Sequence, residues 1–190
     1  MEKLSALLEN TAETIEDADA ALVEKVAPSD KAAVQALSLI GEIGDQPPMR
    51  ALCASIIISG LIRRDAKLTL AGVRMLTAHT IATKAKNVLK KRVDRVRPDA
   101  REGEDDHRVK AGVSASHDET SFPSGHSAGA LAVGAAFGRA FPEHKAVAVG
   151  SATAIALLQV PRRSHYLSDV IVGSAIGLVC EGVVDRLIRG

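Results

Sequence analysis

The chain has 190 residues, of which 46% are hydrophobic, 25% are charged and only 2% are aromatic. This length and composition fit one domain with a substantial buried core, and they exclude disordered and collagen-like chains. The 24 basic and 23 acidic residues leave a formal net charge of +1, which argues against nucleic acid as a partner.

Apolar residues recur at helical spacing along most of the chain. The segments that this spacing predicts to be helical are 3–26, 30–43, 49–62, 66–91, 127–141, 144–160 and 168–188. Residues 93–119 are polar and form the longest expected loop, and no segment alternates as a strand does. The sequence therefore predicts an all-α bundle of about six or seven helices in one domain, with N-terminal helices at 1–43 and a core at 44–180.

The helix lengths alone leave the question of a membrane open. A spanning helix needs ~20 mostly apolar residues. The uncharged run 146–161 is shorter than that, so these helices also fit the buried core of a soluble bundle. The mean hydropathy of +0.10 is likewise intermediate between soluble and multi-pass membrane proteins.

The distribution of basic residues favours insertion into a membrane. The segments expected to cross are 49–62, 68–89, 127–141, 146–160 and 169–188. The short connections rich in Arg and Lys then share one side, while the loop 90–126 and the turn 160–168 share the other. Because positive connections stay cytoplasmic, we expect a multi-pass protein of the cell (inner) membrane whose second side faces away from the cytoplasm.

Three polar segments on that second side contain the candidate chemistry. In the first, Lys90 and Arg97 are seven residues apart and share a face if the helix continues, and Pro98 fixes the chain beyond them. Two cations on one face suit an oxyanion with several charges. A solvated basic helix end, which offsets the helix dipole, would show the same pattern.

The second segment opens an apolar helix. Ser124 and Gly125 at a helix N-terminus would present free backbone N–H groups to an anion, and Gly125 lets a ligand approach the backbone. His126 stands where it could give a proton to a leaving oxygen. The alternative is an ordinary serine N-cap beside an incidental histidine.

The third segment places His165 and Asp169 four residues apart, which is one helical turn. An aspartate that holds one imidazole nitrogen leaves the other free as a base or nucleophile. A surface ion pair or half of a metal site would show the same spacing. Taken together, however, the three segments contain the groups needed for phosphoryl transfer through a phosphohistidine.

The ordered motifs resemble the type 2 phosphatidic acid phosphatase superfamily, which includes bacterial lipid phosphatases, class A acid phosphatases and vanadium haloperoxidases. The pattern of that family is Lys-x6-Arg-Pro, then Pro-Ser-Gly-His, then Ser-Arg-x5-His-x3-Asp. The residues that match are Lys90, Arg97 and Pro98, then Pro123, Ser124, Gly125 and His126, and finally His165 and Asp169. The resemblance covers about 44–180 and implies one phosphatase domain over 1–190.

The third motif departs from the family pattern at two positions. Gln159 stands where the family has an arginine, and Leu158 stands where it has a serine. We expect Arg162, three residues before His165, to supply the missing charge, and Arg163 to point elsewhere.

The resemblance implies hydrolysis of a lipid phosphate or diphosphate with no metal and no other cofactor. The residues implied in binding the phosphate of this lipid or polyprenyl substrate are Lys90, Arg97, Ser124, Gly125 and Arg162. His165, held by Asp169, would attack phosphorus, and His126 would protonate the leaving group. Two alternatives stay open: a vanadium-haloperoxidase-like oxidoreductase, and a membrane protein whose activity is impaired because the third-motif arginine is missing.

Overall fold

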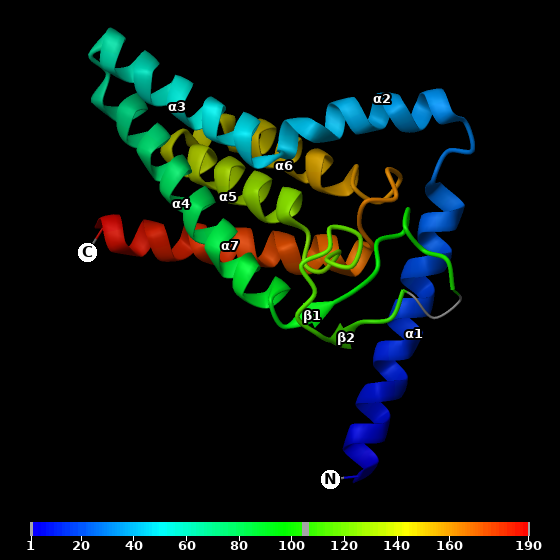
Figure 1. The fold of residues 1–190 in the computed structure, drawn as a ribbon. Helices are drawn as coiled ribbons and strands as arrows, with labels where there is room; N and C mark the ends of the chain where they lie inside the picture. Colours follow the sequence, from blue (N-terminus) through cyan, green and yellow to red (C-terminus); the bar gives the residue numbers. More distant parts are fainter. Residues whose placement is uncertain (1, 104–106, 190) are drawn as a thin grey trace.

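Figure 1 shows the fold of the computed structural model, which describes residues 2–103 and 107–189. The α-helices are α1 (Glu2–Val26), α2 (Lys31–Gly41), α3 (Gln46–Arg63), α4 (Ala66–Lys90), α5 (Gly125–Ala140), α6 (Lys145–Leu157) and α7 (Leu167–Arg189). Two short 3-10 helices, η1 (Glu42–Gly44) and η2 (Pro142–His144), precede α3 and α6. The prediction of an all-α bundle with six or seven helices is confirmed, since the described residues form seven α-helices.

The polar loop between α4 and α5 contains regular structure that periodicity did not predict. Strands β1 (Val93–Asp94) and β2 (Lys110–Ala111) pair antiparallel, and an isolated bridge joins Arg95 to Thr120. Strands of two residues are too short to show the alternation by which strands are found in a sequence. The pairings fold the loop back on itself, so the chain just after α4 lies against the chain just before α5.

Local signals explain the predicted break between the third and fourth helices. Asp65 caps α4, because its side chain accepts a hydrogen bond from the Leu68 amide at 3.0 Å. Arg64 before it adopts a left-handed conformation, with φ of 53°, and ends α3.

The start of α3 also follows a local signal. Pro47 lies in the first turn of α3, where a missing N–H loses no helical hydrogen bond.

Helix α5 lies at the centre of the bundle, packed against α4, α6 and α7. Its close approach to α7 depends on two glycines. A Cβ at Gly173 would lie 2.4 Å from the Ser124 carbonyl oxygen, and a Cβ at Gly177 would lie 2.4 Å from the Ala128 carbonyl oxygen. As a result the N-terminus of α5 lies directly on α7, and the Ser124 amide donates to the Asp169 backbone carbonyl at 3.1 Å.

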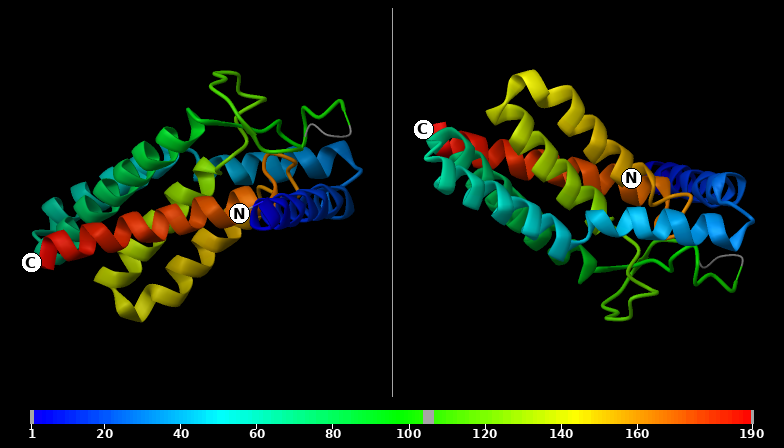
Figure 2. Two further views of the ribbon diagram at one scale, coloured as in Figure 1. Left: turned by 90° about the horizontal axis from the view of Figure 1, so that it is seen from below. Right: turned by 90° about the horizontal axis from the view of Figure 1, so that it is seen from above.

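The loops that contain the three motifs gather at one end of the bundle, away from the C-terminus (Figure 2). The connection between α4 and α5 and the turn between α6 and α7 both lie there, with α1 and α2 beside them. The turn between α3 and α4 lies at the opposite end, near the C-terminus. This is the separation that the sequence predicts from helix counting.

One helix of the described chain is long and apolar enough to cross a membrane. This is α7, whose most apolar window has a mean hydropathy of 1.8. Helices α5 and α6, with 16 and 13 residues, are shorter than the ~20 residues of a typical span. Basic residues reduce the hydropathy of α3 and α4. The arrangement with five crossings therefore stays a prediction.

Candidate active site

The three motifs meet around one cavity of about 280 Å³ at the loop end of the bundle. The residues that line it are Gly44, Asp45, Gln46, Lys86, Lys90, Arg97, His117, Thr120, Gly125, His126 and His165. Of the residues predicted to act, the cavity thus brings together Lys90, Arg97, Gly125, His126 and His165. The other predicted residues, Ser124, Arg162 and Asp169, are not among the residues that line it.

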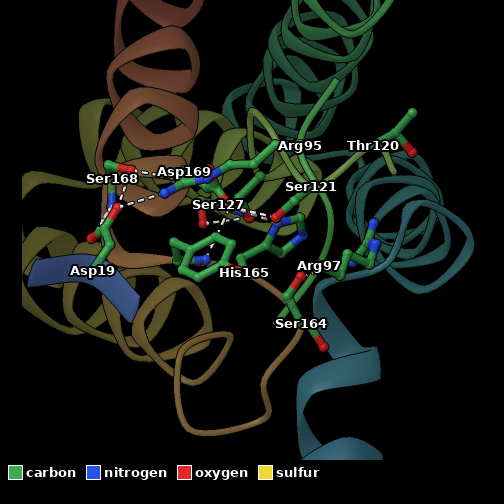
Figure 3. Close-up of polar contacts among 12 residues, drawn as sticks. Asp19, Arg95, Arg97, Thr120, Ser121, Ser127, Ser164, His165, Ser168 and Asp169 are labelled. Carbon is green, nitrogen blue, oxygen red and sulfur yellow. Dashed lines mark hydrogen bonds and ion pairs between the residues drawn. The ribbon is translucent and has the colours of Figure 1, made fainter. Parts of the chain in front are cut away.

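Ser121 lies between His165 and Asp169. The Nδ1 atom of His165 is 3.4 Å from Ser121 Oγ and 3.7 Å from Asp169 Oδ2, so the direct contact with the aspartate is longer than a hydrogen bond. Ser121 Oγ donates to Asp169 Oδ2, and its oxygen can therefore accept the Nδ1 proton of His165. This chain of contacts leaves the free lone pair on Nε2 of His165, a residue that lines the cavity. The three side chains converge in Figure 3.

Asp169 is fully buried and is held by donors on both of its oxygens. Oδ1 accepts from Arg95 Nη1 at 2.7 Å, and Oδ2 accepts from the Tyr166 amide at 2.9 Å. Arg95 also contacts Asp19 of α1, with 3.2 Å between Nη2 and Oδ2, and its guanidinium stacks 3.9 Å from the centre of the Tyr166 ring. Figure 3 shows Arg95 between the two carboxylates. These contacts hold the Asp169 carboxylate in one orientation behind His165.

Burial keeps the ring of His165 neutral. It lowers the pKa of His165 to about 3, although the neighbouring Asp169 acts in the opposite direction. A neutral imidazole with a free Nε2 is the form that can attack an electrophile.

His126 faces His165 across the cavity. The two ring centroids are 6.2 Å apart, with 63° between the ring planes, and both rings line the cavity. Nε2 of His126 lies 3.0 Å from Asp45 Oδ1. Burial lowers the pKa of His126 to about 4, and nearby cations add to this effect while the Asp45 carboxylate opposes it. An anion bound next to His126 would raise the pKa of this histidine, as the Asp45 carboxylate does, and would favour its protonated form.

Lys90 and Arg97 bring uncompensated positive charge to the cavity. Within residues 2–103 and 107–189 neither forms an ion pair. Instead, Lys90 donates to the Thr120 carbonyl, while Arg97 donates at 2.9 Å to the carbonyls of His117 and Ser164. Burial and the neighbouring cations lower the pKa of Lys90 to about 7. Two cations held by neutral carbonyls create a positive potential that attracts an anion.

Ser124 is the N-cap of α5. Its Oγ accepts from the Ser127 amide at 3.3 Å, and its own amide is engaged with the Asp169 carbonyl. The next two amides, of Gly125 and His126, have no acceptor among the residues that the structure describes. These are therefore the helix N-terminal groups that are free to bind an anion.

The side chain at the position of the missing arginine is engaged away from the cavity. Gln159 is fully buried; its Nε2 donates to the Ile155 carbonyl at 2.9 Å, and its Oε1 accepts from Arg162 at 3.2 Å. Arg162 packs against Gly41, where a Cβ would lie only 2.1 Å from its Nη1. Arg163 lines a separate cavity. The contact between Arg162 and a phosphate stays a prediction.

The family follows from comparison with known proteins. The model of the PAP2 superfamily matches residues 49–189, a range that includes all three motifs. The chain belongs to the PAP2 superfamily. The resemblance seen in the sequence is thus confirmed. Among curated proteins, none matches the sequence.

Two solved structures share the fold of this PAP2 chain. It is similar to the first transmembrane PAP2 type phosphatidylglycerolphosphate phosphatase from Bacillus subtilis, with a TM-score of 0.68 and 22% identity, over 93% of this chain and 87% of that chain. It is also similar to LpxE from Aquifex aeolicus, with a TM-score of 0.64 and 21% identity, over 87% of this chain and 93% of that chain.

The sequence motifs of this PAP2 chain missed several groups that lie around the candidate site. These are Asp19, Asp45, Lys86, Arg95 and Ser121. Lys86 could have been found, because it precedes Lys90 by one turn of a predicted helix. Asp19 could not, since no local pattern links the first helix to the motifs.

Proposed function

We propose that this protein is a membrane phosphatase that hydrolyses a lipid phosphate or diphosphate through a phosphohistidine, without a metal. The observation that carries the proposal is that His165 and His126, with ring centroids 6.2 Å apart, line one cavity together with Lys90 and Arg97. The fold shared with a transmembrane phosphatidylglycerolphosphate phosphatase supports a substrate of the same class.

In the first step, His165 Nε2 attacks phosphorus and forms a P–N bond while the P–O bond to the leaving group breaks. Ser121 and Asp169 stabilise the imidazolium that forms, through its Nδ1 proton. His126, protonated once the anion is bound, gives its proton to the leaving oxygen. Lys90, together with Arg97 and the free amides of α5, stabilises the charge that develops on the phosphoryl oxygens.

In the second step, water replaces the leaving group. His126 is now neutral and takes a proton from this water as the water attacks phosphorus and the P–N bond breaks. Inorganic phosphate leaves, and both histidines return to their starting states. The same residue therefore acts first as an acid and then as a base.

An apolar cavity next to the site suits the hydrocarbon chain of a lipid. It has a volume of about 490 Å³ and lies among α3, α4, α5 and α6, with Met49, Phe137 and Ile155 in its walls. Ile155 in its wall packs against Gly44, which lines the phosphate cavity: a Cβ on Gly44 would lie 2.6 Å from Ile155 Cγ2. With its phosphate at His165, a lipid would extend its chain into this apolar space.

Exposed apolar side chains support a membrane location. Ile62 on α3, Val147 on α6 and Leu187 on α7 are exposed by 78%, 72% and 75%. They belong to a larger set of exposed apolar side chains on α3, α4, α6 and α7, and extensive exposed apolar surface marks contact with a membrane or a partner. We place the protein in the cell (inner) membrane, as a multi-pass protein with the motif loops facing away from the cytoplasm.

The function is tested with the purified protein in detergent. The substrates are phosphatidate, phosphatidylglycerolphosphate, a polyprenyl diphosphate, a lipid A phosphate and a soluble aryl ester, each with and without EDTA. We expect phosphate release from at least one lipid, unchanged by EDTA and inhibited by vanadate. Activity that disappears with EDTA and returns with Mg²⁺ or Zn²⁺ would refute the metal-free mechanism. Bromide oxidation by added hydrogen peroxide that depends on vanadate would support the haloperoxidase alternative.

The location is tested by fractionation and by labelling of a cysteine introduced as Ser116→Cys in the motif loop. The two native cysteines, Cys53 and Cys180, are buried. We expect the protein in the membrane fraction and Ser116→Cys labelled by an impermeant reagent from the non-cytoplasmic side. Recovery without detergent in the soluble fraction, or labelling only from the cytoplasm, would refute the placement.

A further inference from the structure

Lys86 is a buried cation that no step of the mechanism above uses. It lies on α4 one turn before Lys90, so both side chains share a face of the helix, and both line the cavity. The residue is only 9% exposed. Within residues 2–103 and 107–189 it has neither an ion pair nor a hydrogen-bond acceptor. A buried charge without a partner is costly, which indicates that its partner is a ligand.

The position of this ammonium group coincides with the start of α5. Its Nζ lies 3.1 Å from the point that a Cβ on Gly125 would occupy. Gly125 and His126 have the two amides that lack an acceptor in the described part of the chain. An ammonium group and free amides at a helix N-terminus each favour a negative oxygen, and here they converge on the same spot.

We propose that Lys86 is a third phosphate-binding cation, in contact with a non-bridging oxygen of the substrate beside Gly125. It makes up for the arginine that the family pattern has at Gln159. The inference rests on the proposed function, and it assigns the compensating charge to Lys86 rather than to Arg162. Arg162 does not line the cavity and is hydrogen-bonded to Gln159, whereas Lys86 lines the cavity itself.

The three cations explain why the site would prefer a phosphate with two negative charges. Lys86, Lys90 and Arg97 share a cavity of about 280 Å³, and like charges at short range repel one another. A dianion placed among them removes this repulsion and also supplies Lys86 with the partner that it lacks.

The test compares Lys86→Met with Lys84→Met on the exposed face of the same helix. The Met side chain keeps the unbranched stem and removes the ammonium group. Two quantities are measured in detergent: kcat/KM on the best lipid substrate, and vanadate affinity from the shift in thermal unfolding. We expect Lys86→Met to lower kcat/KM by roughly 10²–10³-fold, the loss typical of one preorganised donor, and to weaken vanadate binding about tenfold or more.

Lys84→Met should leave both quantities unchanged, and Lys86→Arg should restore part of each. Lys86→Gln is the second neutral variant if Lys86→Met does not fold. Unchanged kcat/KM and vanadate affinity in the neutral variants would overturn the proposal, as would a large loss in Arg162→Ala alone. If the wild type hydrolyses none of the lipids, the proposed function fails, and vanadate affinity by itself still decides whether Lys86 binds the anion.

Discussion

Arg95 donates to Asp169 at 2.7 Å, and both side chains are completely buried. Arg95 follows α4 in the chain and Asp169 lies in the first turn of α7, so their contact fastens the first motif to the third. The same guanidinium contacts Asp19, which also accepts hydrogen bonds from the amide and hydroxyl of Ser168. The N-terminal helix α1 is thereby attached to the residues that hold His165 in place, Arg95 and Asp169.

Removal of the charge of Asp19 should disturb both stability and turnover. Asp19→Asn leaves Arg95 with one carboxylate in place of two, and a broken buried ion pair destabilises by about 3–5 kcal/mol. We expect a lower thermal unfolding midpoint and a lower kcat with little change in KM, because Asp19 acts through Arg95 and does not touch substrate. The control is Glu13→Gln, an exposed carboxylate on the same helix. Equal stability and kcat in the two variants would contradict this role.

Ser121 should matter for catalysis although it does not line the cavity. In Ser121→Ala the Nδ1 atom of His165 loses its nearest acceptor, while Asp169 stays 3.7 Å away. We expect kcat to fall by roughly 10–100-fold, as for other groups that orient a reactive histidine, with KM nearly constant. Ser121→Thr keeps the hydroxyl and should retain more activity. If Ser121→Ala matches the exposed-loop control Ser116→Ala, the serine has no positioning role.

The two histidines should respond differently to the leaving group. His165→Ala removes the nucleophile and should abolish turnover of both an alkyl and an aryl phosphate. His126→Ala removes the proton donor, so it should reduce turnover of the alkyl ester far more than that of the aryl ester, whose leaving group needs no proton. The measurement is kcat/KM on both esters, and equal losses in His126→Ala would count against the acid role.

The activity should fall as the pH rises through about 7. In the proposed mechanism Lys90 binds phosphate in its protonated form, and its pKa is about 7, so KM should rise above that pH. Below that pH the ammonium is present; above it the charge is lost. His165, with a pKa of about 3, stays neutral at mildly acidic pH. The Lys90→Arg variant stays charged, so its activity should not fall above pH 7, even if its maximal activity is lower. If the activity of both proteins falls at the same pH, the fall belongs to another group.

Local patterns in the sequence were sufficient to predict the helices and most of the motif residues that line the cavity. Helical spacing and turn residues predicted the segments, and the order of the motifs predicted that Lys90, Arg97, His126 and His165 meet. Side-chain placement in the turn between α6 and α7 was harder to predict. Because α7 begins only at Leu167, residues before it do not follow helical geometry.

This turn explains two differences from expectation. His165 precedes α7, so the i, i+4 spacing to Asp169 gives a separation of 3.7 Å with Ser121 between them. Arg162 likewise is not one helical turn from His165, and its side chain packs on α2. The contacts of Asp19 with Arg95 were not predictable, because they join segments far apart in the chain.

Trapping the phosphohistidine tests the central claim most directly. In the proposed second step His126 activates water, so the intermediate should accumulate in His126→Ala supplied with an aryl phosphate, which needs no proton donor in the first step. Rapid quenching at alkaline pH followed by mass spectrometry should find an acid-labile phosphate on His165 of this variant, and none in His165→Ala. Steady turnover with no phosphate on His165, or with phosphate on another residue, would contradict the account.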